Sequence, residues 1–178
     1  MTRIVLVFGL ISGAIAAGLM WLLITVQNRG LVDLENGMTF GYATMIIALT
    51  LVFFGIRSYR DNHGGRISFW KGVQVGILIS LISAVIYACS WEAYYRSSGQ
   101  EFLEKYAAHY IDGLRKENKS DPDIEKARAD MAQFQEAYKN ILLRFPMTML
   151  EILPVGIIVT LISAALLRKR EILSAEPA

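Results

Sequence analysis

Two acidic residues lie in or beside long apolar stretches and are the first candidates for chemistry. Glu151 interrupts the apolar run 146–167, and Glu92 follows the charge-free run 72–91. An ionisable group inside a membrane is costly, so it invites a functional explanation. Pro154 lacks an amide hydrogen and frees the carbonyl four residues earlier, beside Glu151. Glu151, Glu92 and Pro154 are therefore candidates for binding a proton, a cation or an amine.

Structural explanations are open for both acids. Arg96 follows Glu92 by four positions, an orientation that favours an ion pair along one helix. Glu151 has no basic residue within one helical turn, so its partner would come from elsewhere in the chain. The alternatives are a proton shared with Glu92 or a hydrogen bond from Arg96, Arg144 or Arg29.

Residue patterns of known enzymes are missing from the sequence. It contains no H-E-x-x-H, no glycine-rich phosphate loop and no G-x-S-x-G. Its single cysteine, Cys89, allows no intramolecular disulfide, and we expect Cys89 to be a small buried residue of a helix. We therefore expect no enzyme, no cofactor and no metal site.

These candidate residues must be positioned by membrane-spanning helices. Hydrophobic residues make up 54% of the sequence, which is above the usual range of soluble proteins. A helix of about 20 apolar residues crosses the roughly 30 Å hydrocarbon layer. Four segments meet this length: 4–26, 38–56, 72–91 and 146–167.

The distribution of charge predicts how these spans are oriented. The net charge of +2 is too small to indicate a nucleic-acid partner. Basic residues gather in the loop 57–71 and in the tail after residue 167, and the positive-inside rule places both, with the N-terminus, in the cytoplasm. The loop is either a plain determinant of topology or a site for anionic lipid headgroups. Its candidate residues are Arg57, Arg60, Arg66 and Lys71.

The segment 97–145, between the third and fourth spans, is long enough to form structure in water. Its composition predicts one helix over 100–116 and a second that begins at Asp121, the N-cap, followed by Pro122. The second helix carries apolar residues at alternating steps of three and four, which is typical of a coiled-coil seam. The seam consists of Ile124, Ala127, Met131, Phe134, Tyr138, Ile141 and Phe145.

A seam this regular must pack against another surface, because isolated helices gain most of their stability from a buried apolar face. The first helix of the segment can provide that surface and form an extracytoplasmic helical hairpin. A second subunit or another envelope protein can also provide it. Candidates for partner binding are Met131, Phe134 and Tyr138.

Small residues recur at every fourth position along the third span. They let a second helix approach closely, either within one bundle or in a homodimer. This stripe consists of Gly72, Gly76, Ser80, Ala84 and Ala88, and the first span offers Gly9 and Gly13.

Several short motifs, taken together, resemble a family of small bacterial inner-membrane proteins, domain of unknown function number four-one-nine-nine. The resemblance covers nearly the whole chain. It implies four spans, a large outer segment before the last span and the bacterial inner membrane, but it implies no activity. The motifs include Gly9-Leu10-Ile11-Ser12-Gly13, Gly64-Gly65-Arg66-Ile67-Ser68-Phe69-Trp70, Trp91-Glu92-Ala93 and Glu151-Ile152-Leu153-Pro154-Val155-Gly156.

The sequence thus predicts an all-α, polytopic membrane protein with four transmembrane helices and an extracytoplasmic two-helix hairpin. The expected function is a structural or accessory role in the envelope, in contact with the lipid bilayer, as a homo-oligomer or with another envelope protein. The alternative is a small transporter or ion-coupled carrier that uses Glu151.

Overall fold

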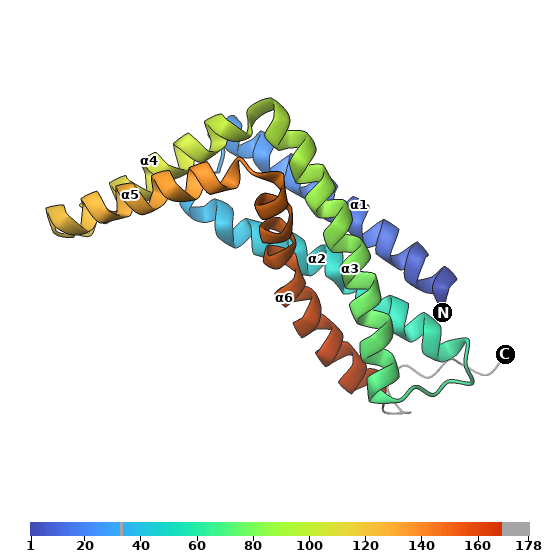
Figure 1. Cartoon of the computed structure of the whole chain (residues 1–178). Coiled ribbons are helices and arrows are strands. Elements are labelled where there is room, and N and C mark those ends of the chain that lie inside the picture. The colour runs from blue at the N-terminus through green and yellow to red at the C-terminus, as the bar shows by residue number, and fades with distance from the viewer. Residues whose placement is uncertain (33, 169–178) are drawn as a thin grey trace. The chain divides into compact units, whose positions relative to one another are not determined.

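The computed structural model describes residues 1–32 and 34–168, and this part of the chain is almost entirely helical (Figure 1). The basic and acidic residues of the tail from 169 onward and Asp33 lie outside the described residues. The helices are α1 (Thr2–Asn28), α2 (Leu34–Asp61), α3 (Phe69–Tyr94), the π-helix η1 (Tyr95–Gly99), α4 (Gln100–Lys116), α5 (Asp121–Tyr138) and α6 (Ile141–Leu167).

Four helical segments are long and apolar enough to cross a membrane. The segment that contains the predicted span 72–91 continues through η1 and α4 without a break, because η1 joins α3 directly to α4. Four such segments indicate a multi-pass membrane protein in contact with lipid, as the sequence predicts. Their bounds are Thr2–Asn28, Thr39–Asp61, Phe69–Lys116 and Ile141–Leu167.

The chain divides into two compact units. The first contains Met1–Ala88 together with the chain from Met149 onward, and the second contains Cys89–Thr148. We call the first unit the apolar bundle and the second the polar hairpin. Helices α3 and α6 each contribute one end to each unit.

Serine hydroxyl groups bond to backbone carbonyls inside the apolar bundle. Ser12 Oγ on α1 donates to the carbonyl of Ala48 on α2 at 2.8 Å, and both residues are fully buried. Ser83 Oγ on α3 lies 3.3 Å from the carbonyl of Gly9 on α1. Such bonds satisfy buried hydroxyls where lipid offers no partner, which lets polar residues contribute to helix packing.

The small residues of α3 lie against small residues of α6. A β-carbon added at Gly76 would come within 2.5 Å of Thr160 Cγ2, so the two backbones approach closely at this point. Gly72 faces Ala164 and Gly156 faces Ser80, which continues the contact one turn to each side. Gly9 and Gly13 of α1 face Ile82 and Ile86 of α3, and Ala84 and Ala88 are fully buried.

In the polar hairpin, α4 and α5 pack against each other, and Gln135 Nε2 donates to the carbonyl of Leu103 at 3.1 Å. Helix α4 has the predicted bounds. The turn after it places Asn118 in the left-handed region at φ 55°, a conformation that asparagine tolerates. The N-cap of α5 is Ser120 and not Asp121, because the Ser120 hydroxyl accepts the amide hydrogen of Asp123 at 3.4 Å.

Two other expectations were wrong. The second helix of the segment does not continue to Phe145, because α5 ends at Tyr138 and α6 begins at Ile141, which is exposed. Cys89 is exposed and not buried. Periodicity identifies one face of α3 as packed, but Cys89 does not lie on that face.

Candidate functional site

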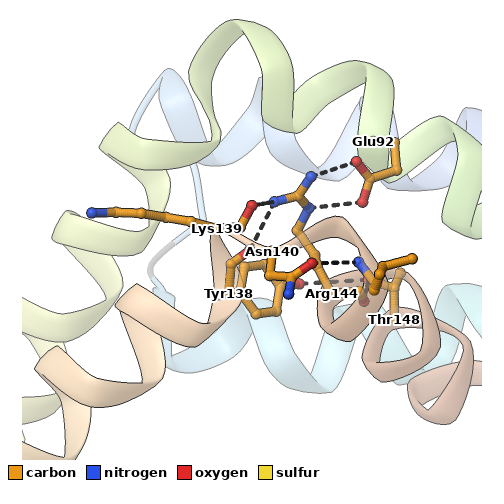
Figure 2. A network of polar contacts seen from close by, with 7 residues as sticks. Glu92, Tyr138, Lys139, Asn140, Arg144 and Thr148 are labelled. Carbon is orange, nitrogen blue, oxygen red and sulfur yellow. Dashed lines mark hydrogen bonds and ion pairs between the residues drawn. The ribbon is translucent and has the colours of Figure 1, made fainter.

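A buried ion pair joins Glu92, near the end of α3, to Arg144, near the start of α6 (Figure 2). Both residues belong to the polar hairpin. Arg144 Nη2 lies 2.6 Å from Glu92 Oε2, and Arg144 Nε lies 2.7 Å from Glu92 Oε1. The residues are 7% and 5% exposed. Two parallel hydrogen bonds from a planar guanidinium to a carboxylate are the strongest geometry for such a pair.

The same guanidinium closes the end of α5. Arg144 Nη1 donates to the carbonyl of Tyr138 at 2.7 Å and to that of Lys139 at 3.2 Å (Figure 2). The last carbonyls of a helix have no partner within the helix, so a cation there is favourable. Asn140 Oδ1 then accepts the amide hydrogen of Leu142 at 3.0 Å and starts α6. These contacts explain why the predicted continuous helix is interrupted after Tyr138.

Aromatic rings enclose the charged pair. The Tyr95 ring centroid lies 3.7 Å from Cζ of Arg144, and that of Tyr138 lies 5.9 Å from the same atom. Tyr95 belongs to η1, and its ring lies so close to Gly99 that any β-carbon at this position would overlap it. Glycine at 99 therefore allows Tyr95 to cover the guanidinium, where a cation–π contact is favourable.

A threonine ties the start of α6 to this cluster. Thr148 Oγ1 donates to the carbonyl of Arg144 at 3.0 Å and lies 3.5 Å from the hydroxyl of Tyr138. The cluster as a whole connects the end of α3, the end of α5 and the first two turns of α6. Arg144 donates to both oxygens of Glu92, so this ion pair joins the end of α3 to the start of α6.

The structure therefore corrects the expected partner of Glu92. Glu92 pairs with Arg144, 52 positions away, and not with Arg96. A signal for the true partner was present in the sequence, because Arg144 is the basic residue that directly precedes the fourth apolar run. The spacing of residues along one helix favoured Arg96, because such spacing identifies only partners within the same helix.

Glu151 lies on an exposed face of α6, in the apolar bundle. Within the described part of the chain no hydrogen bond or ion pair involves its carboxylate. Neighbouring positions on that face are apolar and open, such as Leu150 at 64% exposed, and Pro154 is exposed too. Helix α6 continues through Pro154 to Leu167.

The residues predicted to bind a partner separate into two groups. Met131 and Phe134 are half-buried and line a cavity of about 650 Å³ between α4 and α5. Tyr138 is only 5% exposed and belongs to the charged cluster, so it is not available to a partner. Its ring packs against Phe134 with centroids 5.2 Å apart.

The basic residues of the loop 57–71 also differ from one another. Arg60 is 1% exposed, and its Nε donates to Asp61 at 2.9 Å, so it is the least available to a headgroup. Arg57 lies 3.5 Å from Asp61, and Lys71 Nζ donates to Gln74 at 2.8 Å. Arg66 is exposed.

An exposed ion pair lies at the end of α5, beside the cluster. Lys139 Nζ donates to Glu136 at 2.6 Å on the surface of α5. This hydrogen bond raises the pKa of Lys139 above its usual value, and the charge of Glu136 adds to the effect.

Comparison with known proteins supports the resemblance noted from the motifs. Residues 7–169 match the family described as "Protein of unknown function (DUF4199)". No curated protein matches the chain, and no solved structure matches it. The match covers most of the chain, and the protein therefore belongs to the DUF4199 family.

Proposed function

We propose that this protein is a non-enzymatic component of the bacterial inner membrane, in which the α4–α5 hairpin on the extracytoplasmic side binds a second copy of the chain. The positive-inside rule supports this orientation, because the loop 57–71 is basic. Its role in the envelope would then be structural or accessory, since it acts by assembling with other copies of itself in the membrane.

One observation carries this proposal: the groove between α4 and α5 is apolar and open. Tyr106, Tyr110 and Leu114 of α4 line it together with Met131 and Phe134 of α5. Tyr110 is 44% exposed. An aromatic, uncovered groove on a helical hairpin is typical of an interface with another helix.

The charges at the edge of the groove suit a second copy. Lys126 and Asp130 both line it, both are exposed, and neither has an ion pair within residues 1–32 and 34–168. In a two-fold symmetric contact, if one residue contacts a second residue of the partner subunit, the second residue also contacts the first residue of the partner. If two α5 helices cross antiparallel near Arg128, Lys126 lies opposite Asp130 of the partner subunit, and this pair forms twice.

A charge swap tests the proposal. Lys126→Asp or Asp130→Lys should weaken the dimer about tenfold or more through like-charge contacts, while the double variant K126D/D130K should restore it. The measurement is the mass of the purified protein by light scattering in detergent across a concentration series. Lys116→Asp, at the exposed end of α4, is the matched control.

A monomeric wild-type protein at all concentrations, or a double variant as weak as the single ones, would refute the two-fold contact. Polar substitution of Met131 or Phe134 provides a second check on the apolar groove. Such variants should lose the dimer while membrane insertion persists.

A second candidate function is ion-coupled transport through Glu151. The supporting observation is a carboxylate without a described partner on an apolar face of a membrane helix, which is costly unless it binds a proton or a ligand. Glu151→Gln should then abolish a proton- or cation-dependent flux in proteoliposomes while the protein stays folded. No flux with a broad panel of cations and amines would exclude this function.

A further inference from the structure

A polar cavity of about 630 Å³ lies beside η1 in the polar hairpin. Arg96, Ser97 and Ser98 of η1 line it, and Lys139 and Arg144 approach from the end of α5 and the start of α6. Glu101 and Glu104 of α4 complete the charged lining. The cavity is distinct from the apolar groove between α4 and α5.

Two charges of opposite sign in this cavity are unpaired. Arg144 is occupied by Glu92, Glu101 binds Lys105 at 2.6 Å, and Lys139 binds Glu136. Among the described residues, Arg96 and Glu104 have no ion pair, and both side chains are exposed. The pairing of Glu92 with Arg144 is what leaves Arg96 available.

A buried hydroxyl adds a second, independent observation. The Tyr95 hydroxyl oxygen is buried and has no hydrogen-bond partner within the described chain, although Tyr95 lines the cavity. Leaving such a group unpaired is costly, so a ligand that bonds to it is favoured. A phosphate oxygen is a suitable acceptor for a hydroxyl and a guanidinium together.

The unpaired charges define the chemistry of the ligand. Arg96 and Glu104 are eight positions apart, or on the order of 12 Å along a helix. Because the two side chains have opposite charges, a ligand that bonds to both must carry an anionic group and a cationic group. We propose that this cavity binds a phosphoethanolamine group, with its phosphate at Arg96 and the Tyr95 hydroxyl and its ammonium at Glu104.

The place of the cavity along α3 and η1 favours a lipid as the source of this group. Arg96 follows the last residue of the charge-free run, Trp91, by five positions, which is about 7 Å at 1.5 Å per residue. The headgroup layer on each side of the hydrocarbon core is about 5 to 8 Å thick. Arg96 therefore reaches headgroup depth when the charge-free run spans the core.

The test uses the full-length protein purified from vesicles that contain equal amounts of phosphatidylethanolamine, phosphatidylcholine and phosphatidylglycerol. Native mass spectrometry measures which lipid stays bound. We expect about tenfold enrichment of phosphatidylethanolamine, because phosphatidylcholine cannot donate a hydrogen bond to Glu104 and phosphatidylglycerol has no cation.

Variants locate the site. Arg96→Gln and Glu104→Gln should each remove the enrichment, and Arg115→Gln, at an exposed arginine on α4 that does not line the cavity, should keep it. Arg96→Gln and Glu104→Gln should both keep the wild-type melting temperature in detergent, since neither Arg96 nor Glu104 has an ion pair among the described residues. Equal retention of the three lipids, or enrichment that survives both cavity variants, would overturn the proposal.

Soluble phosphoethanolamine separates the two sources of the ligand. If the group comes from lipid, millimolar phosphoethanolamine should leave the bound lipid in place, because the acyl chains add binding energy. If the soluble compound binds and displaces the lipid in the wild type but not in Arg96→Gln, the same chemistry holds and the ligand is a free solute. The result does not depend on dimer formation, since Arg96 and Glu104 lie outside the proposed interface.

Discussion

The apolar bundle and the polar hairpin hold their helices together by different contacts. In the bundle, small residues of α3 and α6 bring two backbones close, and serine hydroxyls bond to carbonyls. In the hairpin, one guanidinium bonds to a carboxylate and two carbonyls at once. The bundle therefore spreads its stability over many modest contacts, whereas the polar hairpin concentrates several of its contacts in Arg144.

The environments of the two units account for this contrast. Lipid cannot satisfy polar groups and offers no hydrophobic gain to helix association, so close packing and internal hydrogen bonds remain. The hairpin holds charges that need a complete set of partners, because an unpaired buried ion costs several kcal/mol. Three ways of disturbing these contacts follow, from the largest expected effect to the smallest.

Removing one charge of the buried pair should have the largest effect. Glu92→Gln leaves the guanidinium of Arg144 buried beside a neutral amide, and we expect the free energy of unfolding to fall by about 3 to 5 kcal/mol. The measurement is denaturant unfolding of the full chain in detergent micelles.

The matched control for this variant is Glu125→Gln. Glu125 lies 3.5 Å from Arg128 at the surface, so its loss should cost less than about 1 kcal/mol. A loss for Glu92→Gln no larger than that of the control would show that the cluster does not hold the hairpin together.

Crowding the contact between α3 and α6 should have an intermediate effect. Gly76→Val inserts a branched side chain where even a β-carbon meets Thr160, and we expect a loss of about 1 to 3 kcal/mol in the same unfolding experiment. Gly18→Val is the matched control, because no atom lies within 4 Å of an added β-carbon there. Equal stability of the two variants would contradict close packing at Gly76.

Breaking an exposed ion pair should have the smallest effect. Glu136→Gln removes the carboxylate that raises the pKa of Lys139 through its hydrogen bond and its charge, so this pKa should move down toward its usual value in an NMR titration. Because the raised pKa belongs to the folded state, the pair stabilises the protein below the unfolded-state pKa of lysine. That contribution disappears as pH rises through the folded-state pKa.

The melting temperature of Glu136→Gln near neutral pH should stay close to that of the wild type, since the pair is exposed. A fall as large as that of Glu92→Gln would remove the distinction between buried and exposed pairs in the hairpin.

The four apolar segments, the family and the bounds of α4 could all be predicted from the sequence. These features depend on local properties: the length of an apolar run, a set of short motifs, and apolar periodicity followed by turn residues. The small-residue stripe of α3 was also visible as a pattern, although its partner on α6 was not.

The contacts between residues far apart in the sequence could not be predicted in the same way, because they depend on how the helices pack. Glu92 selects Arg144 over Arg96 because Arg144 offers two parallel hydrogen bonds and also closes the end of α5. The end of α5 at Tyr138 could not be read from its seam, because a guanidinium six positions later stabilises the interruption. Periodicity also could not place Cys89, since exposure depends on which neighbouring helix covers each face.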